Sequence, residues 1–109
     1  MNLDDSAIDP VVRDAIRAMN ARDRESWLAL FADNATMSDD GDEHDLIEWS
    51  VSELFGESRA YVKDVKRVED NGRTIYADFH SDQWGDFETF MKFDIDDSNR
   101  ITRLDLGQI

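Results

Sequence analysis

The first half of the chain carries the apolar spacing of amphipathic helices. A first helix is predicted to open at Asp9-Pro10, because proline suits the first turn of a helix. A second is predicted from about Arg24 to Phe31, with the Asp23 carboxylate accepting from the free N–H groups of its first turn. Their apolar stripes are Val12, Ala15, Ile16 and Met19 in the first helix, and Trp27, Leu28, Leu30 and Phe31 in the second.

A third helix is predicted after an acidic loop. Asp42 is the expected cap, and Gly56 is the expected stop, because glycine readily adopts the backbone conformation that ends a helix. Its buried face is predicted to consist of Leu46, Ile47, Val51, Leu54 and Phe55.

Beyond Gly56 the apolar period falls to about two, which is typical of strands. Asn71-Gly72 is a strong hairpin signal between two of them. This order of helices followed by an antiparallel meander predicts one α+β domain over residues 1–109, with residues 1–8 as a loose arm. Strands are predicted over residues 60–69, Thr74–Trp84, Phe87–Ile95 and Ile101 to about Gly107, with a short early strand at Ala35–Asp39.

The alternation assigns side chains to the two faces of this sheet. Phe79 shares the inward face with Ile75, Ala77 and Ser81, because alternate residues of a strand point the same way. The outer face combines aromatic residues with charges, as association surfaces do, which predicts a homodimer through this face. The alternative is a solvated sheet with scattered aromatics. The predicted interface residues are Tyr76, His80, Trp84 and Phe90.

Composition narrows the possible partners. The 109 residues include 26 acids and 12 bases, giving a formal net charge of −14. Such a charge repels phosphate backbones, so neither nucleic acid nor an anionic membrane is an expected partner. The acidity fits either a high-salt habitat or an ordinary acidic protein. Without cysteine, and with an acidic N-terminus unlike a signal peptide, the chain is expected to be cytoplasmic.

The segment from Asn20 to Asp39 reads NARDRESWLALFADNATMSD. It resembles the nuclear transport factor 2-like superfamily, with its SnoaL-like and ketosteroid isomerase-like proteins, in which a helix, "L-F-A-D-D-A" and a short strand follow one another. The resemblance covers nearly the whole chain. It implies three helices on the concave face of a strongly curved, mainly antiparallel sheet, forming a cone-shaped α+β barrel around a pocket. Members often dimerise through the outer sheet face.

Asp39 is the acid that this resemblance singles out. It falls where the ketosteroid isomerase branch carries its aspartate general base, and a carboxylate beside an apolar pocket can abstract a proton next to a carbonyl. The donors that hold the enolate oxygen in that branch match Ala15 and Met91, whose side chains donate no hydrogen bond. His44 is a candidate acid/base partner for Asp39. The alternative for both is a solvated acidic turn.

No cofactor or dedicated metal site is predicted. The acidic run from Asp39 to Asp45 does not follow the spacing of a calcium loop, and two separated histidines without cysteine do not form a zinc motif. A small hydrophobic ligand is the expected partner if the pocket is open. The predicted lining residues are Trp27, Phe31, Met37, Trp49, Phe55, Phe79, Phe87 and Met91.

Three hypotheses remain open from the sequence. The first is a small-molecule binding or accessory protein of the SnoaL-like type. The second is an isomerase-, cyclase- or dehydratase-type enzyme that uses Asp39 as general base on a small carbonyl or polycyclic substrate. The third is a protein-interaction module that uses the outer sheet face.

Overall fold

The computed structural model describes residues 7–109, and its first two helices begin as the sequence predicts. α1 spans Pro10–Asn20, and the Asp9 carboxylate accepts a hydrogen bond from the Val11 N–H at 2.9 Å. α2 spans Arg24–Ala29, and Asp23 accepts from the Ser26 N–H at 3.1 Å. Both aspartates therefore satisfy N–H groups that the first helical turn leaves free.

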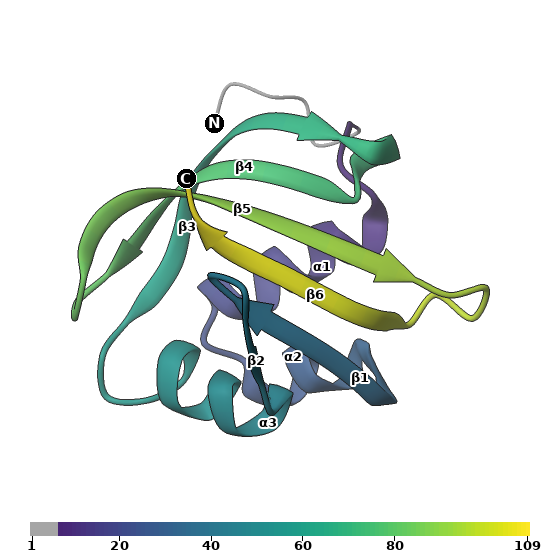
Figure 1. Ribbon diagram of the computed structural model, residues 1–109, viewed down its shortest axis with the longest axis horizontal. Helices are drawn as coiled ribbons and strands as arrows, with labels where there is room; N and C mark the ends of the chain where they lie inside the picture. Colours follow the sequence, from purple (N-terminus) through teal and green to yellow (C-terminus); the bar gives the residue numbers. More distant parts are fainter. Residues whose placement is uncertain (1–6) are drawn as a thin grey trace.

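A six-stranded, strongly curved sheet follows, and the helices pack on one side of it (Figure 1). Its order is β2-β1-β6-β5-β4-β3, with neighbours antiparallel except for β1 and β6, which run parallel. The predicted α+β fold of helices on the concave face of a curved sheet is confirmed. The strands are β1 Phe31–Asp39, β2 Asp42–His44, β3 Ala60–Glu69, β4 Thr74–Ser81, β5 Gly85–Ile95 and β6 Ile101–Gln108.

The third helix differs from the prediction at its start. Asp42 does not cap it, because residues Asp42–His44 form β2 by pairing back on β1. Asp45 is the cap instead, and its carboxylate accepts from the Glu48 N–H at 3.0 Å. His44 consequently lies in an exposed strand and not in the first turn of a helix.

The same helix changes its hydrogen-bond pattern part-way along. α3 spans only Leu46–Trp49, and a π-helix, η2, continues it over Ser50–Leu54. The Phe55 N–H donates to the Ser50 carbonyl at 3.0 Å, five residues back. The buried face consists of Leu46, Trp49, Ser50 and Leu54, which differs from the predicted one: Ile47 is 58% exposed and Val51 37% exposed.

Two further boundaries differ from the prediction. α2 ends before Phe31, which already belongs to β1 and pairs with Ile101 of β6. β4 stops at Ser81 and does not reach Trp84. The Ser81 hydroxyl accepts hydrogen bonds from the N–H groups of Gln83 and Trp84, both at 3.2 Å, and so turns the chain.

The core lies between the helices and the concave face of the sheet. It includes the predicted stripe of α1 and the inward faces of β4 and β5. Ile8 is buried in it, whereas residues 1–6 of the predicted arm lie outside the described residues. In residues 7–109 no helix has the length and apolar character needed to cross a membrane. The largest fully buried side chains include Trp27, Phe93, Met19, Met37, Leu54, Ile75, Met91, Ile101 and Leu104.

Candidate functional site

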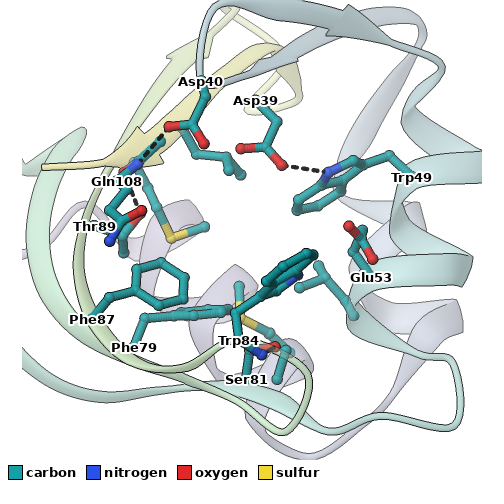
Figure 2. A pocket seen from close by; sticks show the side chains of 16 residues that line it. Asp39, Asp40, Trp49, Glu53, Phe79, Ser81, Trp84, Phe87, Thr89 and Gln108 are labelled. Atoms are coloured by element: carbon teal, nitrogen blue, oxygen red, sulfur yellow. Dashed lines mark hydrogen bonds between the residues drawn. The ribbon is translucent and has the colours of Figure 1, made fainter.

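A cavity of about 430 Å³ opens between the concave face of the sheet and the α3–η2 helix (Figure 2). The end of β1, the hairpin between β4 and β5, the end of β6 and η2 all contribute residues to it. The lining residues are Met19, Asp39, Asp40, Trp49, Glu53, Leu54, Ala60, Phe79, Ser81, Trp84, Phe87, Thr89, Met91, Leu106, Gly107 and Gln108.

Most of the cavity wall is apolar because of strand alternation. Phe79 of β4 faces Phe87 of β5 across a directly paired position, with ring centroids 5.5 Å apart. Met91 follows on the same face of β5, four residues further along. The alternation that buries this face of the sheet therefore supplies an aromatic and thioether surface to the cavity.

Asp39 reaches the cavity from the last position of β1. The Trp49 indole Nε1–H donates to its Oδ2 at 3.0 Å, which ties the end of β1 to α3 (Figure 2). Oδ2 is thus held by the indole, and Asp39 is partly buried. Its second oxygen has no hydrogen-bond partner among the described residues.

Asp40 lies beside it in a left-handed backbone conformation, with φ of 51°. Its Oδ1 accepts from the Gln108 N–H at 2.7 Å, which joins the β1–β2 turn to the end of β6. Gly107 makes this approach possible, because a Cβ there would lie 2.7 Å from the same oxygen. Glu53 enters the cavity from the π-helix, beside Trp49 (Figure 2).

Trp84 forms part of the cavity mouth from the turn between β4 and β5, and it is 68% exposed. This placement corrects its predicted position on the outer face, because the strand alternation stops at Ser81. His80 braces the turn: its Nδ1 lies 2.5 Å from Asp86 Oδ1 and its Nε2 lies 2.7 Å from Asp82 Oδ1. The hydrogen bond to Asp86, and to a smaller extent the one to Asp82, raises the pKa of His80 above its ordinary value.

The structure brings only half of the predicted lining residues to the cavity. Trp49, Phe79, Phe87 and Met91 line it. Trp27, Phe31 and Met37 instead lie fully in the core, and Phe55 packs against that core from its edge. All four side chains are apolar, as the wall of an apolar cavity requires. They instead fill the space between α2, β1 and the sheet.

The predicted partners of Asp39 are not assembled around it. His44 pairs with Met37 in the register of β2 with β1, while Asp39 pairs with Asp42. Ala15 is buried in α1 and is not part of the cavity wall, whereas Met91 is. Among residues 7–109 no three side chains of His, Asp or Glu converge as a metal site would require.

Several lining residues were missed by the sequence analysis. Thr89 had a usable signal, because it shares the inward face of its strand with Phe87 and Met91. Asp40 was treated only as part of an acidic turn. Glu53 could not be placed, because its orientation depends on the π-helix. The remaining predicted residues Tyr76, His80 and Phe90 are half-buried and absent from the cavity wall.

Solved structures show which fold this is. An NTF2-like protein of unknown function from Cytophaga hutchinsonii matches with a TM-score of 0.67 and 14% identity, over 100% of this chain and 95% of its own. Δ5-3-ketosteroid isomerase from Mycobacterium sp. matches with a TM-score of 0.64 and 18% identity, over 92% and 91%. RV0760c from Mycobacterium tuberculosis, in complex with estradiol-17β-hemisuccinate, matches with a TM-score of 0.64 and 16% identity, over 87% and 88%.

The chain therefore has the nuclear transport factor 2-like α+β fold, and the resemblance found in the sequence is confirmed at the level of the fold. No protein-family model and no curated protein matches the sequence. A shared fold does not fix an activity, so the function has to be argued from the cavity itself.

Proposed function

We propose that this protein binds a small, largely apolar molecule in its cavity and acts as a binding or accessory protein. The observation that carries the proposal is the open cavity of about 430 Å³ with aromatic and aliphatic walls. Pockets for small organic ligands typically measure about 300–1,000 Å³ and have apolar walls with a few polar groups. The complex of RV0760c with estradiol-17β-hemisuccinate supports the size class, since that protein shares the fold.

An enzyme that uses Asp39 as general base is the second candidate. In its favour, Asp39 lies in the cavity wall, and Trp49 holds one of its oxygens and leaves the other without a partner among the described residues. Against it, Ala15 and Met91 occupy the positions that match the family's oxyanion donors, and neither side chain can donate. The binding function is therefore preferred.

Asp39→Asn separates the two candidates. We expect the neutral dye Nile red to bind the wild type and the variant within about twofold, because the apolar walls are unchanged. Exchange of the α-protons of 2-decalone for deuterium, followed by NMR, reports proton abstraction directly. A binding protein leaves the exchange rate at the buffer value in both forms.

Two results would change this conclusion. Exchange faster than in buffer with wild type, lost in Asp39→Asn while dye binding persists, would establish the enzyme. If the wild type binds neither Nile red nor any smaller apolar probe, whether neutral or charged, the proposed binding function is removed.

We further infer that two copies associate through the outer face of the sheet. No described helix covers that face (Figure 1). Tyr76 and Phe90 are directly paired across β4 and β5 on it, and both are half-buried. Lys63 and Lys66 on β3 form ion pairs with Asp86 of β5 and Asp78 of β4, which neutralise acidic side chains of the sheet in a chain with net charge −14.

Sedimentation velocity tests this association. We expect the wild type to sediment at twice the chain mass of 12.6 kDa at micromolar concentration, and more completely at high salt, where repulsion between acidic copies is screened. Tyr76→Glu should give the monomer. Ile47→Glu, which adds the same charge at an exposed position of α3, should remain dimeric. A monomeric wild type would refute the inference.

A further inference from the structure

All the described ionisable side chains that line the cavity are acidic. Its ionisable lining side chains are Asp39, Asp40 and Glu53, and the described lining contains no lysine, arginine or histidine. They come from two walls: the two aspartates from the end of β1 and the turn after it, and Glu53 from η2 (Figure 2). A ligand in the cavity would therefore face carboxylates from two adjoining elements of the wall.

The oxygens of these carboxylates accept few hydrogen bonds from the rest of the protein. Asp39 and Asp40 each accept one hydrogen bond, from the Trp49 indole and the Gln108 backbone respectively. Glu53 is half-buried and makes no side-chain hydrogen bond or ion pair with any described residue. None of the three is in an ion pair with a described lysine or arginine. Acceptor capacity therefore remains free at the cavity.

The neighbouring aromatic rings favour the same sign of ligand charge. The indoles of Trp49 and Trp84 and the rings of Phe79 and Phe87 all line the cavity. The faces of such rings attract cations, tryptophan most strongly, and the attraction grows where water is excluded. A positive group over the face of one of these rings would be attracted by the ring as well as by the carboxylates, and the carboxylates repel an anion.

We propose that the cavity selects a compact apolar molecule that carries one positive charge, such as a protonated amine on an aliphatic or aromatic skeleton. The apolar part lies against Met91, Phe79 and Phe87, and the cation lies toward Glu53 and Asp39 between the two indoles. This inference rests on the proposed binding function and specifies its ligand class.

Three probes with one skeleton test the charge selectivity: 1-adamantylmethylamine as the cation, 1-adamantanemethanol as the neutral form and 1-adamantanecarboxylate as the anion. Titrations are followed by calorimetry at about 0.15 M salt, where exposed charges more than ~8 Å away are largely screened. The amine is expected to bind at least about tenfold more tightly than the alcohol, a ratio within reach of one partly desolvated ion pair. No binding is expected for the carboxylate.

Glu53→Gln and Glu48→Gln form a matched pair of variants. Both remove one negative charge from the same helical segment, but Glu48 is exposed and is not part of the cavity wall. Glu53→Gln should weaken amine binding about fivefold to tenfold and leave alcohol binding within about twofold, because only the cation uses the carboxylate. Glu48→Gln should leave both affinities within about twofold.

Three outcomes overturn the inference. Equal affinity for the amine and the alcohol removes the charge selectivity, while the proposed binding function stands if Nile red or the alcohol still binds. An equal loss of amine affinity in both variants assigns the preference to the overall charge of the protein and not to the cavity. If no probe and no Nile red binds the wild type, the proposed function fails together with its ligand class.

Discussion

Trp27→Ala is expected to lower the free energy of unfolding by about 3–5 kcal/mol, the usual range for truncating a buried tryptophan. Trp27 is 0% exposed, and its ring lies against Phe31 at the start of β1 and Phe55 after the π-helix, at centroid distances of 5.1 and 6.3 Å. Its Nε1–H donates to Ser50 Oγ at 3.0 Å. One side chain on α2 thus joins two other elements, and the substitution would leave a cavity among all three.

Urea unfolding followed by circular dichroism measures the loss. Trp84→Ala is the control, because Trp84 is 68% exposed and its removal should change the stability by no more than about 0.5 kcal/mol. A domain of this size has a total stability of about 5–15 kcal/mol, so Trp27→Ala could leave much of the population unfolded. A loss below about 1 kcal/mol would show that the site collapses without a cavity.

Ser50→Ala isolates the hydrogen bond in the same contact. Ser50 is fully buried at the first position of η2, and removing its hydroxyl leaves the indole N–H without that partner. The expected loss is about 1–3 kcal/mol, the cost of an unsatisfied buried donor. A neutral result in the same unfolding experiment would mean that the indole finds another acceptor.

Sequence reasoning succeeded where one local rule decides the structure. Asp9 and Asp23 cap α1 and α2, because a short carboxylate at that position meets N–H groups that have no other partner. Asn71 and Gly72 both take positive φ between β3 and β4, as the hairpin signal implied. The inward face of β4 and β5 followed from alternation alone.

It failed where two local preferences compete. The acidic run before Leu46 offers several caps, and pairing of Asp42–His44 with β1 decides in favour of Asp45. Glu53 lines the cavity from the π-helix, and no periodicity marks that helix in advance. These choices depend on contacts between distant segments, which a single sequence does not display.

The candidate site shows the same division. Phe79, Phe87 and Met91 were predicted from their shared strand face, and the structure places all three in the cavity wall. Trp27 and Met37 were assigned to the same wall, but they fill the core. Apolar character alone does not distinguish a residue that fills space from one that borders an empty space. That distinction requires the packing of the whole domain.

Gly72→Ala is expected to be the most damaging of the conservative glycine substitutions. Gly72 has φ of 88°, and a Cβ there would overlap the backbone N of Asp9 and lie 2.6 Å from the Ala7 carbonyl oxygen. The left-handed conformation costs a non-glycine residue about 1–2 kcal/mol, and forced overlap adds about 1–3 kcal/mol, so the expected total is about 2–5 kcal/mol. The Asp9 N–H bond to the Gly72 carbonyl, at 3.0 Å, would also be disturbed.

Gly41→Ala separates the two contributions in this prediction. Gly41 has nearly the same φ, 86°, but a Cβ there would meet no atom within 4 Å. Its substitution should cost only the conformational part, about 1–2 kcal/mol, in the same urea experiment. The excess loss in Gly72→Ala then measures how tightly the segment before α1 packs against the β3–β4 hairpin. Equal losses would show that this segment moves aside freely, so that the Asp9 cap, its 3.3 Å ion pair with Arg73 and the burial of Ile8 contribute little to stability.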